Sequence, residues 1–179
     1  MHQKINAEIA QNRKMNIETD KETIFIKMVL DAWQKQNERV DELLAKISKE
    51  QLQQETAPGR NTGFYLFGHL AAVNDRLFEL LGIGERLHPE LDAPFLENPD
   101  KSGQQMPSVD EIKRYWNDIN TALNEKFNAM QPHEWFQKHN AVSDEDFAKE
   151  PHRNRLNVII TRTVHQGYHL GQMNYLKDR

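Results

Sequence analysis

Hydrophobic residues recur every three or four positions along four stretches of this chain, which is the spacing that places side chains on one face of an α-helix. The stretches cover about residues 20–49, 62–81, 108–131 and 154–177. Polar and proline-containing segments separate them. The pattern predicts an all-α protein with four long helices.

Local signals mark the expected helix ends. Thr19 and Glu22 form a capping-box pattern at the start of the first stretch, and Ser108 and Glu111 form another at the start of the third. The second stretch follows a Pro-Gly turn and ends at Gly82, a residue type that is favoured just after a helix. These signals predict where three of the four helices begin or end.

The segments outside the four stretches differ in character. Residues 1–18 are polar with scattered isoleucines and are either a short helix or a loose arm, so we divide the chain into this N-terminal arm and a domain of residues 19–179. The proline-containing link at 85–107 is expected to run over the surface. The aromatic residues of 133–151 are expected to pack onto the bundle, with a short helix after Ser143.

The last stretch carries apolar residues in most directions around its helix, so we expect neighbouring helices to enclose it and Tyr168 to belong to the core. Its exception is a polar stripe. Unpaired buried polar groups cost about 1–3 kcal/mol, so these side chains need partners. The stripe consists of Thr161, Arg162, His165, His169 and Gln172.

Two histidines of this stripe, His165 and His169, are four residues apart and project from one helix face at a spacing that lets both bind one metal ion. His69 lies between Leu66 and Val73 on the core-facing stripe of the second helix and is the candidate third ligand. A chance histidine pair and a hydrogen-bonded core histidine are the alternative explanations. Taken together, three histidines flanked by apolar residues on two helices favour a metal site.

The composition limits the chemistry and the partners. The 179 residues suit one domain and include no cysteine, so any thiol in a reaction has to be a bound ligand. A net charge of -4 with scattered basic residues argues against nucleic-acid binding. The chain has no signal-peptide core and no run of about 20 apolar residues, so we expect no membrane association and a cytoplasmic location.

The tripeptide Gly68-His69-Leu70 and the segment from His165 to Met173 resemble the DinB superfamily of bacterial metal-binding four-helix bundles. The resemblance extends over roughly residues 20–177. It implies an up-down-down-up bundle with a long link between helices two and three. Carried over residue by residue, the metal ligands of the family fall on His69, His165 and His169.

The first 18 residues and the segment 133–152 have no counterpart in the family pattern. The other histidines of the chain are expected to be exposed loop residues: His2, His88, His133, His139 and His152.

Three imidazoles suit Zn(II), Ni(II) or Fe(II) and leave a coordination position for water or substrate. The leading hypothesis is a metal-dependent S-transferase that uses bacillithiol, mycothiol or glutathione, the thiols that the resemblance implies, together with a small-molecule substrate. Arg162, one turn before His165, can bind a carboxylate or phosphate of the thiol, or can end in a salt bridge or in solvent. Gln172 contacts either a neighbouring helix or the free N–H of a ligand histidine.

Two alternatives share the same metal site. Metal-bound water could hydrolyse an ester or amide. The protein could instead be a non-catalytic metal-binding or damage-response protein that forms a homodimer through the aromatics around Trp135 and the apolar residues of the arm. No residue is recognisable as a dedicated general base, because Asp31, Asp75 and Glu79 are expected to be solvated surface carboxylates.

Overall fold

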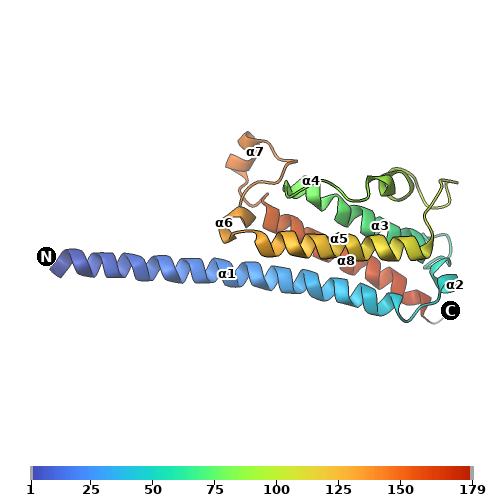
Figure 1. Cartoon of the computed structure of the whole chain (residues 1–179), viewed down its shortest axis with the longest axis horizontal. Helices are drawn as coiled ribbons and strands as arrows, with labels where there is room; N and C mark the ends of the chain where they lie inside the picture. The colour runs from blue at the N-terminus through green and yellow to red at the C-terminus, as the bar shows by residue number, and fades with distance from the viewer. Residues whose placement is uncertain (1, 178–179) are drawn as a thin grey trace.

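A computed structural model describes the backbone of residues 2–177 and the side chains of residues 21–177. Within these residues the protein is all-helical, as predicted, and contains no strand. The long helices are α1 (His2–Leu44), α3 (Gly63–Asp75), α5 (Val109–Ala129) and α8 (Arg155–Met173), and they lie side by side (Figure 1). None of the helices within residues 2–177 is long and apolar enough to cross a lipid bilayer.

Short helical segments lie between the long helices and after the last one. They are α2 (Lys49–Leu52), α4 (Leu77–Leu81), the 3₁₀ turn η1 (Pro89–Leu91), the π turn η2 (Ala93–Glu97), α6 (Pro132–Trp135), α7 (Asp144–Lys149) and the 3₁₀ turn η3 (Asn174–Leu176). The short helix predicted after Ser143 is therefore present as α7, and the Ser143 side chain caps it.

The starts of three long helices agree with the sequence prediction because a polar side chain caps each of them. Thr62 caps α3, Asn154 caps α8, and Ser108 caps α5 in a reciprocal capping box with Glu111. Gly82 follows α4 with a φ of 66°, a left-handed conformation that glycine adopts without strain. The local signals thus fixed these helix ends.

The predicted start and end of the first helix are both wrong. α1 runs without interruption from His2 through the Thr19 pattern, since no glycine or proline stops a helix in this part of the chain. It ends at Leu44 rather than near residue 49, because Ser48 is extended and caps α2. The N-terminal part of α1 projects beyond the other helices (Figure 1).

The link at 85–107 is only partly the surface connection that we expected, since residues 101–105 are exposed but its middle is buried. Leu91 and Phe95 are fully buried, and the Phe95 ring packs against Phe64 and Tyr65 of α3 at centroid distances of 5.9 and 6.0 Å. The π turn η2 contains Phe95, so the link is held on α3 by an aromatic anchor. This anchor sets the position of the η2 backbone next to α3.

α8 is less enclosed than its sequence predicted. Val164 is 70% exposed and Tyr168 is 64% exposed, so the assignment of Tyr168 to the core is wrong. Phe25 and Met28 of α1 are exposed on the same side of the molecule, where they line an apolar groove with Val164. α8 packs against α1 and α3, and one of its faces is left open.

Trp135 was predicted both to pack on the bundle and to contribute to a dimer surface. It is only 1% exposed, so the first expectation is confirmed and the second is wrong. The arm was the other proposed part of that surface, and its side chains lie outside the described residues.

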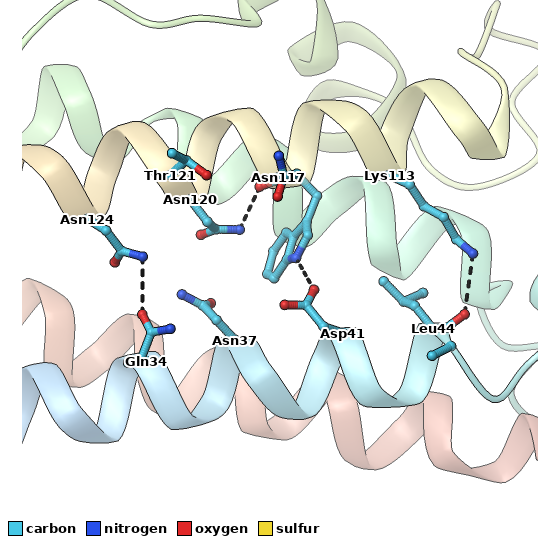
Figure 2. A pocket seen from close by; sticks show the side chains of 11 residues that line it. Gln34, Asn37, Asp41, Leu44, Lys113, Asn117, Asn120, Thr121 and Asn124 are labelled. Atoms are coloured by element: carbon cyan, nitrogen blue, oxygen red, sulfur yellow. Dashed lines mark hydrogen bonds between the residues drawn. The ribbon is translucent and has the colours of Figure 1, made fainter.

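A polar seam joins α1 to α5 (Figure 2). Asn124 Nδ2 donates to Gln34 Oε1 at 3.1 Å, and Trp116 Nε1 donates to the Asp41 carboxylate at 2.8 Å, across a cavity of about 470 Å³. Burial raises the pKa of Asp41 even though the Trp116 hydrogen bond opposes this. α1 is therefore attached to α5 by directional hydrogen bonds.

Asp75 is not the solvated surface carboxylate that we expected. Its side chain is completely buried and accepts hydrogen bonds from Arg86 Nε at 2.9 Å and from the backbone N–H of Leu87 at 2.8 Å. Arg86 also binds both oxygens of Asp92, which pairs with Arg76 as well. Burial alone would raise the pKa of Asp92, but the two arginines lower it to about 2. This network ties the start of the 85–107 link to the end of α3.

Replacement of Asp75 by alanine should lower the free energy of unfolding by about 3–5 kcal/mol, because it leaves the nearly buried Arg86 short of a partner and the backbone N–H groups of Leu87 and His88 unsatisfied. Urea denaturation would measure the loss. Asp31→Ala is the control, since Asp31 forms an exposed pair with Lys27 and should cost less than about 1 kcal/mol. Equal losses in the two variants would contradict the role given to the buried carboxylate.

Candidate metal centre

Three histidines meet between α3 and α8. His69 comes from α3, and His165 and His169 come from α8, one turn apart. The Nε2 atoms of His69 and His169 lie 3.3 and 3.0 Å from Nε2 of His165. All three residues are half-buried, and among the described residues theirs is the only group of potential metal ligands. The structure thus brings together the three histidines that the sequence singled out.

Hydrogen bonds on the far side of two rings fix their protonation. His69 Nδ1 lies 3.0 Å from the carbonyl oxygen of Phe95, and His169 Nδ1 lies 2.7 Å from Oε1 of Gln172. Both oxygens only accept, so each Nδ1 carries the hydrogen and donates it. In the neutral rings, the Nε2 atoms of His69 and His169 therefore present lone pairs to the centre of the cluster.

Without a cation, this arrangement leaves nitrogen atoms unsatisfied. A hydrogen on His165 Nε2 can be donated to only one of the two facing lone pairs, and His165 Nδ1 is buried with no partner among the described residues. A tetrahedral zinc ion with Zn–N distances of about 2.0–2.1 Å holds its nitrogen ligands about 3.3 Å apart, close to the distances found here. The cluster therefore fits a metal ion better than it fits a hydrogen-bonded core.

The charge state of the cluster suits metal binding. Burial is the main cause that lowers the pKa of all three imidazoles. The pKa of His165 falls to about 4, with further contributions from His169, His69 and Arg162. Neutral imidazole is the form that ligates a metal, so the three rings are ready to bind one at neutral pH.

Sequence reasoning missed one component of the site, the Phe95 carbonyl that orients His69. Its position depends on Gly68, because a Cβ atom there would lie 2.2 Å from an atom of the Phe95 ring. The available signal was a glycine inside an apolar helical pattern, next to the histidine. Gln172, by contrast, was considered as a partner of a ligand histidine, and the structure places it in that position.

Arg162 lies on α8 one turn before His165. Its positive charge lowers the pKa of both His69 and His165, which places it near the cluster. It is half-buried and makes no hydrogen bond or ion pair with the residues that the structure describes, so the salt bridge considered for it is not formed there. Its side chain lines an open cavity of about 530 Å³.

The remaining histidines stand apart from the cluster. His133 and His152 are exposed, as expected, although His133 lies in α6 rather than in a loop. His2 lies outside the residues whose side chains are described. His88 is not a free loop residue, since its ring stacks on Tyr115 at a centroid distance of 3.9 Å. His139 is also partly buried and accepts a hydrogen bond from a backbone N–H.

The fold and the site define an all-helical protein with a three-histidine cluster between two long helices. The sequence model of the DinB superfamily matches residues 32–173, so the chain belongs to this superfamily and the resemblance seen in the sequence is confirmed. No curated protein matches the chain. The crystal structure of a conserved protein from Enterococcus faecalis has a similar fold, with a TM-score of 0.60 and 16% identity over 84% of this chain and 94% of that one.

Gly68→Ala should weaken metal binding about 10- to 100-fold and cost about 1–3 kcal/mol of stability, because Phe95 and its carbonyl have to move away from His69. Gly171→Ala is the matched control on α8. A Cβ there meets nothing within 4 Å, so this variant should keep its metal affinity and gain about 0.4–1 kcal/mol. Competition with a chromogenic chelator and urea denaturation measure the two effects. Unchanged metal affinity in Gly68→Ala would argue against the carbonyl's role.

The metal-free protein should lose stability as the pH falls from 6.5 toward about 4. In this range the unfolded chain binds protons on histidines that the folded protein keeps neutral, so acid favours unfolding. His165→Gln should flatten this part of the pH dependence, and the exposed His133→Gln should not. Thermal unfolding in EDTA at several pH values tests this, and the idea fails if the two variants show the same slope.

Proposed function

We propose that this protein is a metal-dependent S-transferase in which His69, His165 and His169 hold a divalent transition metal, Zn, Ni or Fe, and a low-molecular-weight thiol takes the free position. The observation that carries the proposal is the convergence of three Nε2 atoms, with no fourth ligand from the residues whose side chains the structure describes. Three protein ligands with an open position are typical of catalytic metal sites.

The proposal includes the up-down-down-up arrangement of the four long helices. Contacts at one end of the molecule support it. Gln51, soon after the end of α1, donates a hydrogen bond to the carbonyl of Leu176 after α8. Lys113, in the first turns of α5, donates to the carbonyl of Leu44 at the end of α1, and Gly63 at the start of α3 lies against Leu176.

A bound cation supplies one property, a lower pKa for the thiol, which then reacts as the thiolate. The residues of the chain do the rest. Phe95 and Gln172 keep the ligand rings in the tautomer that faces the centre, and Arg162 offers a guanidinium for an anionic group of the thiol or substrate. Because the chain has no cysteine, the nucleophilic sulfur has to come from the bound thiol.

A homodimer stays a prediction. Its candidate surface consists of the exposed apolar side chains of Phe25 and Met28 on α1 and of Val164 and Tyr168 on α8. The backbone of α1 extends beyond the other helices (Figure 1). A single-chain mass in sedimentation experiments would exclude it.

The metal is the first test. Protein purified without a histidine tag should contain close to one transition-metal ion per chain, and His165→Ala should lose most of it. His133→Ala, which removes an exposed histidine, should retain the metal. Equal metal content in parent and His165→Ala would contradict the ligand set.

Product formation from an electrophilic aryl halide, with and without added thiol, then separates the activities. Thiol-dependent product supports the transferase. Hydrolysis of ester substrates without thiol would favour the metal-dependent hydrolase instead, and metal binding without any turnover would favour a non-catalytic metal-binding protein.

A further inference from the structure

A second feature near the metal centre is the cavity that Arg162 lines, with a volume of about 530 Å³. Its walls come from Arg76 at the end of α3, from α4, from the 85–107 link, from the segment between α6 and α7 and from α8. Arg162 is three residues before His165, which corresponds to a rise of about 4.5 Å along the helix. The cavity therefore adjoins the metal centre on the side of Arg162.

The charges of this cavity are only partly neutralised. Asp92 pairs with both Arg76 and Arg86, and Asp75 takes a further hydrogen bond from Arg86. Arg162 has no such carboxylate among the described residues. Burial lowers the pKa of Arg162, and the nearby charge of Arg76 lowers it further. An electropositive position thus remains open beside the metal centre.

Glu79 is the negative counterpart. It lines the same cavity and its side chain is exposed. Its backbone carbonyl accepts a hydrogen bond from Asn140, but its carboxylate forms no hydrogen bond or ion pair with the described residues. The Glu79 carboxylate does not pair with the Arg162 guanidinium either, although both side chains line this cavity. One cavity thus presents a free cationic group and a free anionic group.

We propose that this cavity binds the zwitterionic head of a sulfur-containing amino acid, with its carboxylate on Arg162 and its ammonium group on Glu79. The planar guanidinium binds a carboxylate through two parallel hydrogen bonds, which favours Arg162 as the main contact. The identification of the sulfur compound as the thiol of the reaction rests on the proposed function, but binding of the head group does not.

The charges of the cavity favour this ligand over a phosphate group. A phosphate dianion would gain from Arg162 but would be repelled by the unpaired carboxylate of Glu79, whereas Asp92 is already paired with Arg76 and Arg86. A carboxylate with a neighbouring ammonium group carries no net charge and complements both free side chains.

The test uses the full chain freed of metal with EDTA, so that coordination of sulfur cannot contribute. Three probes are titrated and followed by NMR: S-methyl-L-cysteine, 3-(methylthio)propanoate, which lacks the ammonium group, and 2-(methylthio)ethylamine, which lacks the carboxylate. We expect S-methyl-L-cysteine to bind most tightly. Inorganic phosphate is a fourth probe.

Two variants assign the contacts. Arg162→Met should weaken S-methyl-L-cysteine and 3-(methylthio)propanoate about tenfold or more, the loss expected for a charge-assisted bidentate contact. Glu79→Gln should remove the preference for S-methyl-L-cysteine over 3-(methylthio)propanoate. Arg114→Met and Glu125→Gln, which change exposed charges on α5, are the matched controls and should leave binding unchanged. Urea denaturation shows whether each variant is folded.

Unchanged S-methyl-L-cysteine binding in folded Arg162→Met, or a preference that persists in Glu79→Gln, would overturn the proposal. Phosphate binding that exceeds that of S-methyl-L-cysteine and is lost in Arg162→Met would also overturn it, in favour of a phosphate-bearing ligand. The binding of the head group is measured without metal, so its result does not depend on whether the protein catalyses the proposed reaction. Head-group binding without turnover would retain this site and reject the transferase, and turnover without head-group binding would do the reverse.

Discussion

Three imidazole nitrogens are held within 4.8 Å of one another in a half-buried position, and this arrangement is unfavourable unless a cation shares their lone pairs. The distances of 3.0 and 3.3 Å to His165 place the rings where one cation can accept all three. Burial keeps the rings neutral, which removes the competing proton. Unsatisfied polar atoms destabilise the fold at this point. The packing of α3 against α8, and the hydrogen bonds that orient the rings of His69 and His169, therefore have to offset this cost.

The link between α4 and α5 supplies much of that support. Buried Asp75 binds Arg86 and the backbone of Leu87 at the start of the link, and Phe95 anchors its middle on α3. The same segment delivers the carbonyl oxygen that orients His69. This connection thus supports the metal centre. Its Asp92 pairs with Arg76 and Arg86, whereas Arg162 has no carboxylate partner within the part of the chain that the structure describes.

The correct and incorrect predictions follow from the range of the interactions involved. Ser108 and Thr62 cap their helices through hydrogen bonds to residues three positions on, so a local pattern was enough to predict them. The pattern at Thr19 looked the same but lies inside a helix. Residues such as Asp75 and Tyr168 were misplaced because burial depends on which element packs against that side of the helix, and helical periodicity does not contain this information.

By itself, the amino-acid sequence determined the helical class, most helix starts and the three histidines, because capping, periodicity and the spacing of His165 and His169 are local properties of the chain. Only the tertiary structure decided that His69 meets them, that the Phe95 carbonyl orients its ring, and that no carboxylate of residues 21–177 pairs with Arg162. These facts depend on contacts between residues far apart in the chain. Burial then decides which charges are neutralised, and burial is a property of the packed fold.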